Sequence, residues 1–183
     1  MTEVHDFPSI PAKILLPIDF SSSSRAAFEM AADLALHFHA ELHLVHVIPA
    51  FPTTTFRDFA PEEAFLQEAR THAEQRLAKC QAVLASRGVS SSFSVETGND
   101  VVENIMNVIE REHIDMVVIS THGLSGWHPL VFGSIAEKIL KLVQCPLLLL
   151  HSAKPKGGKS PKEGASDFGA FENVDSKSIS TEL

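Results

Sequence analysis

The chain has little cysteine and no long apolar run. Its two cysteines, Cys80 and Cys145, form neither a CxxC pair nor the cysteine and histidine spacing of a zinc site. Two isolated cysteines are typical of a reducing compartment. Apolar runs such as Leu147–Leu150 are far too short to span a membrane, and residues 1–6 lack basic and apolar signal regions. The sequence therefore predicts a cytoplasmic protein with no membrane partner.

The chain also has no excess of positive charge. Its formal net charge at pH 7 is -8. An acidic surface repels nucleic acid and anionic membranes, so we expect no nucleic-acid partner. That charge does not rule out a local anion site made of backbone amides, because such a site depends on the N–H groups within reach.

Stretches typical of strands alternate with stretches typical of helices. Short apolar or alternating segments predict five strands, at 13–18, 41–48, 91–97, 115–120 and 146–151. Helical spacing, prolines and capping residues predict four helices, at 21–39, 61–87, 101–112 and 134–143. Strands joined by helices need crossovers, which make them parallel and place helices on both faces. The predicted fold is α/β, a doubly wound, open, five-stranded parallel sheet.

The two ends of the chain differ from the middle. Residues 152–183 contain four glycines and repeated lysine, serine and aspartate, with only scattered apolar residues. Such a segment buries too little apolar surface to offset the entropy lost on ordering. We therefore expect an N-terminal extension at 1–11, one folded domain at 12–151 and a disordered tail at 152–183.

The segment from Ile119 to Ser134 leaves a predicted strand and enters a predicted helix. Gly123 lets a ligand approach the backbone, and the helix after Gly133 begins with amides that have no intrahelical acceptor. An anion at that position gains about 0.3–1 kcal/mol from the helix dipole, and the Ser134 hydroxyl adds a donor. Neither GxxxxGK[ST] nor GxGxxG is present. Two interpretations remain open, a phosphate site and a glycine-rich connection in which Ser134 caps the helix.

Several motifs of this chain resemble those of the universal stress proteins. Lys13–Ser21 (KILLPIDFS) is similar to the family's first strand and the Asp-x-Ser that follows it, and 44–49 (LVHVIP) to its second strand. Nucleotide-binding members carry Gly-x-x-Gly, nine residues, then Gly-Ser or Gly-Thr. Here the pattern reads Ser120-Thr-His-Gly123, nine residues, then Gly133-Ser134. With the matching IAEKIL and CPLLL that follow, the resemblance covers 12–151.

The resemblance implies a fold like that of the adenine nucleotide alpha hydrolases and a homodimer formed through the last strand, at Leu147–Leu150. It also implies a stress-response module that binds ATP, with Mg2+ accompanying the nucleotide, and acts in signalling or regulation rather than fast catalysis. Carried over to this chain, the residues at the nucleotide are Pro17, Asp19 and Val47 at adenine and ribose, Ile119 and Ser120 at the ribose and α-phosphate, and Gly123, Gly133, Ser134 and Ile135 at the phosphates. His122 flanks the same loop, where it either meets a phosphate or is an ordinary loop histidine.

Two of these residues have alternative explanations. Ser120 stands where the family has a glycine, so a positive φ at this position would strain the loop, whereas a need for clearance alone would be met by a small serine. The alternative function is then a dimeric stress or interaction protein of the same family that binds no nucleotide. Asp19 has a structural alternative as well, because it could cap the next helix through the amides of Ser21 or Ser22.

The sequence assigns no catalytic and no metal-binding residue. Between Ser120 and Ser134 there is no lysine or arginine to stabilise a transferring phosphoryl group, so we expect at most a slow ATPase. An adenylyl-transferring enzyme of the same superfold would need further basic motifs, which are missing. His43 and His46 should lie on opposite sides of a strand, which disfavours a shared metal site.

Overall fold

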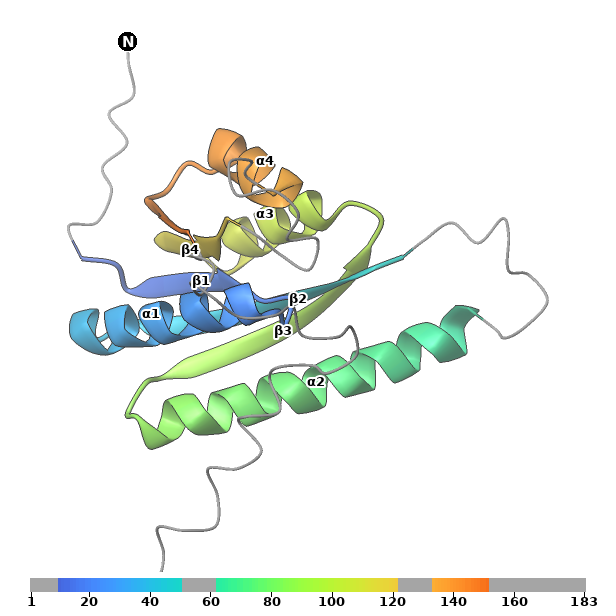
Figure 1. Ribbon diagram of the computed structural model, residues 1–183, viewed down its shortest axis with the longest axis horizontal. Coiled ribbons are helices and arrows are strands. Elements are labelled where there is room, and N and C mark those ends of the chain that lie inside the picture. The colour runs from blue at the N-terminus through green and yellow to red at the C-terminus, as the bar shows by residue number, and fades with distance from the viewer. Residues whose placement is uncertain (1–9, 51–61, 122–132, 152–183) are drawn as a thin grey trace, which may run out of the picture.

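A computed structural model describes residues 10–50, 62–121 and 133–151, which form a sheet covered by helices on both faces (Figure 1). Along the described chain the elements are β1 (Lys13–Pro17), α1 (Ser22–Phe38), β2 (Glu41–Pro49), α2 (Glu62–Ser86), β3 (Ser91–Gly98), α3 (Val101–Arg111), β4 (Met116–Ser120), α4 (Ser134–Leu142) and β5 (Leu147–Leu150). The strands are all parallel, in the order β3-β2-β1-β4-β5. The predicted doubly wound sheet is confirmed. The predicted tail and most of the predicted extension lie outside the described residues.

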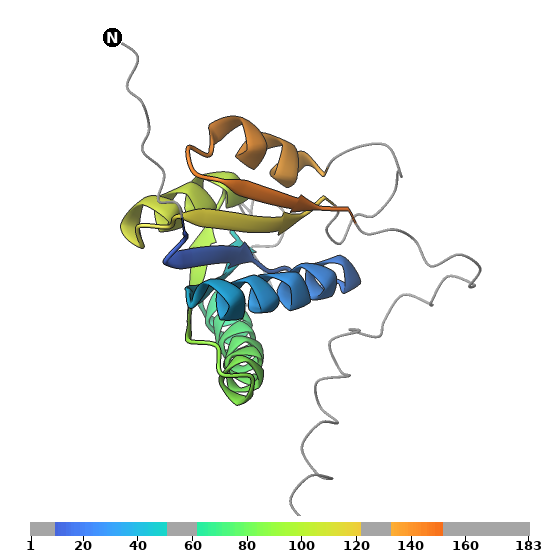
Figure 2. The same ribbon diagram turned by 90° about the vertical axis from the view of Figure 1, so that its left-hand side faces the viewer.

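Two apolar layers hold the helices to the sheet. Alternate residues of a strand face opposite sides, so Ile14 and Leu16 of β1 pack under α1 and α2, while Leu15 packs under α3 and α4. All three are fully buried. Burial of a leucine or isoleucine side chain stabilises the fold by roughly 1.5–3 kcal/mol. Figure 2 shows α1 and α2 on one side of the sheet and α3 and α4 on the other. None of the described helices is long and apolar enough to cross a bilayer.

Polar side chains cap the first turns of α1 and α3. Ser21 accepts a hydrogen bond from the Ser24 amide at the start of α1. Asp100 accepts from the amides of Val102 and Glu103 at the start of α3, at 2.8 and 3.3 Å. These oxygens satisfy amides that have no partner within the helix, and so fix where each helix begins.

The strand order reverses beside β1, and the two neighbours of β1 differ in how far they pair with it. β1 pairs with β2 along its whole length, from Lys13 to Pro17, and Ile18 then donates to the Val45 carbonyl at 2.9 Å. Its pairing with β4 involves only Ile14 and Leu15. β1 therefore follows β2 and separates from β4 toward the carboxyl ends. Open α/β sheets bind ligands at such a reversal point.

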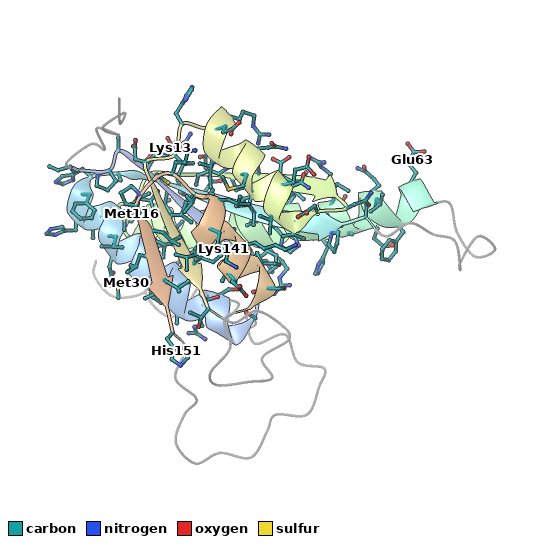
Figure 3. All side chains as sticks on the ribbon, turned by 90° about the horizontal axis from the view of Figure 1, so that it is seen from above. Lys13, Met30, Glu63, Met116, Lys141 and His151 are labelled. Carbon is teal, nitrogen blue, oxygen red and sulfur yellow. The ribbon has the colours of Figure 1, made fainter. Side chains whose placement is uncertain are left out.

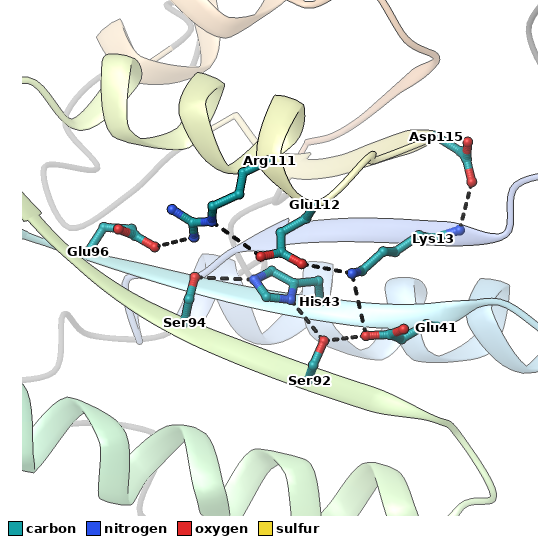
Figure 4. Close-up of polar contacts among 9 residues, drawn as sticks. All are labelled: Lys13, Glu41, His43, Ser92, Ser94, Glu96, Arg111, Glu112 and Asp115. Atoms are coloured by element: carbon teal, nitrogen blue, oxygen red, sulfur yellow. Dashed lines mark hydrogen bonds and ion pairs between the residues drawn. The ribbon is translucent and has the colours of Figure 1, made fainter.

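A polar network lies at the opposite, amino edge of the sheet, centred on His43 (Figure 4). His43 is only 3% exposed, and its ring nitrogens lie 2.9 Å from Ser92 Oγ and 3.2 Å from Ser94 Oγ. The Ser92 hydroxyl donates to Glu41, so it accepts from His43 Nδ1–H and leaves Nε2 to accept from Ser94. This pattern satisfies a neutral imidazole completely.

Charged side chains surround this histidine. Lys13 Nζ lies 2.9 Å from a Glu112 carboxylate oxygen and 3.8 Å from Glu41, and Arg111 lies 2.7 Å from Glu96. Burial lowers the pKa of His43 from its ordinary value of 6.5, and this effect outweighs the opposing influence of Glu112 and Glu41. Folding therefore favours the neutral form of His43.

We predict that this histidine makes the protein less stable in mild acid. The folded-state pKa lies below the unfolded one, so the stabilisation is complete above about pH 6.5 and is lost as the pH falls below it. The slope for one such group is at most about 1.4 kcal/mol per pH unit. In urea unfolding at pH 7.5, 6.5 and 5.5, His43→Gln should lose less of its unfolding free energy on acidification than the unmodified protein. An equal loss in both proteins would contradict this assignment.

Candidate functional site at the carboxyl edge

The site residues expected from the sequence gather at the carboxyl edge of the sheet. Lys13 and His151 mark the two edges in Figure 3, Lys13 beginning β1 and His151 following β5. Pro17 ends β1 and Asp19 follows it, Val47 lies near the end of β2, and Ile119 and Ser120 end β4. At the same edge α4 begins with Ser134 and Ile135, preceded by Gly133. His122 and Gly123 lie outside the described residues.

Ser120 is accommodated without backbone strain. It is the last residue of β4, where it pairs with Leu150 of β5, and the ladder continues as the Thr121 amide donates to the Leu150 carbonyl at 2.8 Å. It is not among the described non-glycine residues with positive φ, which are Phe20, His39 and His113. The hypothesis that this position needs a glycine for a positive φ is therefore wrong for this chain. The remaining reason for a glycine at this position is room for a ligand beside the backbone. A serine side chain is small and takes up little of that room.

Backbone contacts join the two ends of the segment between β4 and α4. The Gly133 amide donates to the Thr121 carbonyl at 2.7 Å. A Cβ on Gly133 would lie 3.0 Å from that same oxygen, although Gly133 has an ordinary φ of -58°. A side chain at this position would therefore be in tight contact with the backbone, and a glycine avoids that contact. Thr121 is 2% exposed, and its hydroxyl lies 3.2 Å from His151 Nδ1, which ties the start of the segment to the end of β5.

The first turn of α4 differs from those of α1 and α3. Its N-cap is Gly133, which has no side chain to bond the first amides. Ser134 is the first helical residue and is exposed, so the interpretation of Ser134 as the helix cap is wrong. A hydroxyl and the amides of a helix start lie together at this position, and they suit an anionic group.

The carboxylate of Asp19 is oriented by the start of α1. Its Oδ1 accepts from the Ser21 amide at 3.0 Å, from the Ser21 hydroxyl at 2.6 Å and from the Ser24 hydroxyl. The Asp19 amide in turn donates to Ser24 Oγ at 3.3 Å. Asp19 therefore has the structural role considered for it, because it bonds the Ser21 amide at the start of α1. This role leaves the half-buried carboxylate in one fixed orientation at the end of β1.

Sequence reasoning missed a cation near the start of α4. A cavity of about 220 Å3 lies between the first turns of α3 and α4, lined by Asn99–Val102, Ser134, Ile135 and Lys138. The segment between Ser120 and Ser134 contains no basic residue, whereas Lys138 lies one turn beyond Ser134 in α4. The spacing of four from Ser134 was the available signal, because residues at i and i+4 share a helix face.

Sequence reasoning also missed the contacts behind Asp19. His46 of β2 and Arg76 of α2 both contact the Phe20 ring, from positions far apart in sequence. His46 and His43 lie on opposite faces of β2, His46 against Phe20 and His43 against β3. Among the described residues, no three histidine, cysteine or acidic side chains are grouped so as to hold a metal ion.

Comparison with known proteins finds matches across the folded part of the chain. A model of the Universal stress protein family matches residues 12–151. Universal stress protein MJ0531 of Methanocaldococcus jannaschii is 27% identical over 147 residues, which cover 79% of this chain and 83% of that protein.

Solved structures match the fold as well. The protein MJ0577 has a TM-score of 0.69 and 22% identity, covering 78% of this chain and 97% of its own. A universal stress protein from Archaeoglobus fulgidus, solved in complex with dAMP, has a TM-score of 0.53 and 17% identity, covering 76% of this chain and 98% of its own. At these identities the likeness shows the fold alone.

We predict that Gly133→Ala destabilises the protein without any ligand. The new Cβ would meet the Thr121 carbonyl oxygen at 3.0 Å, and that oxygen is held by the hydrogen bond from residue 133 itself. Overpacking of this kind costs about 1–3 kcal/mol, so the unfolding free energy in urea should fall by at least about 1 kcal/mol. The neighbouring Ser134→Ala, at an exposed position, should change it by less than about 0.5 kcal/mol. Equal stability of Gly133→Ala and the unmodified protein would show that the contact is not tight.

Proposed function

The chain belongs to the universal stress protein family, and we propose that it binds ATP or a related adenine nucleotide as a signalling or regulatory module. One arrangement chiefly supports this proposal. At the reversal point of the strand order, an oriented carboxylate on Asp19 lies at the same edge as the start of α4, whose N-cap Gly133 has no side chain. A nucleotide has an uncharged base and sugar at one end and an anionic end, so it fits both features.

The base and sugar would lie against the ends of β1 and β2. Val47 is half-buried, apolar and on the α3 side of the sheet, and it would pack against adenine beside Pro17. Asp19 would accept a hydrogen bond from adenine or ribose, since an ionised carboxylate only accepts. Ile119 and Ser120 would border the ribose and the α-phosphate. The complex of a fold relative with dAMP supports an adenine nucleotide as the ligand class.

The phosphates would lie at the start of α4. Donors there are the backbone amides of Gly133–Ile135 and the hydroxyl of Ser134, with Gly123 and His122 expected to join them. Lys138 would supply a positive charge, since it lines the same cavity as Ser134. Asp100 lines this cavity too, and its negative charge favours a nucleotide whose phosphates carry Mg2+.

The same residues argue against fast chemistry. Lys138 is the only cation lining this cavity among the described residues, and the one carboxylate that lines it, Asp100, accepts hydrogen bonds from the first amides of α3. Phosphoryl transfer depends on several positioned charges and an oriented nucleophile. We therefore assign no catalytic residue and expect hydrolysis to be slow at most. Regulation by bound nucleotide, in a stress response, is the function that these residues suit.

Isothermal titration with MgATP tests the proposal. We expect saturable binding by the full chain and about tenfold weaker binding by Ser134→Ala, because a hydrogen bond to a charged group contributes about 1.5–3 kcal/mol. Ser90→Ala is the matched control, since this exposed serine lies before β3 at the amino edge and should leave the affinity unchanged. Absence of heat and of a thermal shift at millimolar MgATP would refute nucleotide binding and favour the alternative, a dimeric interaction protein of the same family.

We propose in addition that two copies pair through β5. This strand is at the end of the sheet, and Leu147–Leu150 are all half-buried. An edge strand offers unpaired backbone groups, and a row of leucines adds apolar surface that a second copy could cover. The homodimer expected from the family resemblance would therefore use this edge.

Analytical ultracentrifugation tests the dimer. The unmodified protein should sediment with about twice the 20.0 kDa of one chain, and Leu149→Asp should halve that mass by placing charge on the strand. Far-UV circular dichroism would check that the variant remains folded. Phe65→Asp, at an exposed apolar position on α2, should sediment like the unmodified protein. A monomeric unmodified protein would refute the proposal.

A further inference from the structure

The turn that carries Asp19 is held from behind by a side chain of the neighbouring strand. We propose that His46 is a positioning residue for Asp19, which it holds by contacting the residues on either side of it. The inference rests on the proposed function, in which the Asp19 carboxylate contacts the nucleotide. It concerns a residue that would not touch the ligand itself.

The first contact of His46 is a hydrogen bond to the residue before Asp19. His46 Nδ1 lies 2.7 Å from the Ile18 carbonyl oxygen. A carbonyl can only accept, so Nδ1 carries the proton and donates. Ile18 is also bound from its other side, because its amide donates to the Val45 carbonyl at 2.9 Å. Both polar backbone groups of Ile18 are thus tied to β2.

The second contact is a ring packed against the residue after Asp19. Phe20 has a φ of 61°, a left-handed conformation that is strained for a bulky residue. Its ring is buried, at 6% exposure, with its centroid 4.8 Å from that of His46 and 3.9 Å from the Arg76 guanidinium carbon. These contacts keep the ring in place and offset the strained backbone.

The two contacts together restrict the chain between Ile18 and Phe20. Asp19 lies in this three-residue turn, and its side chain is oriented by Ser21 and Ser24 at the start of α1. The serine contacts orient the carboxylate relative to α1, whereas His46 fixes the backbone relative to β2. Val47, the residue expected at adenine, follows His46 directly in that strand. His46 therefore links the turn that carries Asp19 to the strand that carries Val47.

The test separates positioning from simple core packing. His46→Phe keeps an aromatic ring against Phe20 and removes the donor to Ile18. We expect it to bind MgATP at least fivefold more weakly, and His46→Asn, which places an N–H near the position of Nδ1, to recover part of the loss. His43→Phe is the matched control, since it changes a histidine on the opposite face of β2. It should lower the melting temperature and leave the affinity unchanged.

A second readout does not depend on nucleotide. The Ser21 amide donates to Asp19 Oδ1, so its hydrogen exchange measured by NMR reports the position of the carboxylate. It should quicken about tenfold in His46→Phe, while the Val118 amide of β4 keeps its protection. Unchanged exchange at Ser21, or an equal quickening at Val118, would overturn the inference.

A double variant tests whether His46 affects binding through Asp19. If His46 acts through Asp19, then His46→Phe should have little further effect on MgATP affinity in a protein that already carries Asp19→Asn. A loss of the same size in both backgrounds would overturn the inference while leaving nucleotide binding intact. No MgATP binding by the unmodified protein would refute the proposed function, and Ser21 exchange would still decide whether His46 positions Asp19.

Discussion

The unequal pairing of β1 with its two neighbours is the constraint on which the rest of this structure depends. β1 stays bonded to β2 through Ile18 but pairs with β4 only at Ile14 and Leu15. The central strand must therefore leave β4 toward the carboxyl edge. Asp19 thus follows the end of one strand and Ser120 ends the other, and no ladder joins β1 to β4 beyond Leu15 and Val117.

Each edge of the sheet uses its polar groups differently. At the amino edge, His43, Lys13, Glu41, Glu112 and their partners bond one another, so those groups are already satisfied within the protein. At the carboxyl edge, α4 begins with a glycine that cannot cap it, and Ser134 and Lys138 face a cavity. The polar groups of the first edge are therefore used within the fold, and those of the second edge are the ones that we propose contact a nucleotide.

Short-range rules in the sequence predicted the fold closely. No strand or helix boundary differs from the expected one by more than one residue, because prolines, caps and apolar periodicity act within a few residues. The Asp100 cap of α3 is local in the same way, because its side chain bonds amides two and three residues further along the chain. Ser120 was harder to judge, since its φ depends on whether β4 continues to pair with β5 at that residue. Neighbouring residues in the sequence therefore could not show whether position 120 requires a glycine.

The sequence by itself determined the alternation of elements, the starts of the helices and the resemblance to a family, because local patterns encode all three. Only the tertiary structure decided which groups meet. The Gly133 amide meets the Thr121 carbonyl, Ser134 shares a cavity with Asp100 because α3 packs beside α4, and His46 reaches Ile18 and Phe20 because β2 lies next to β1. These contacts join residues distant in sequence, and their geometry follows from the packing of whole strands and helices.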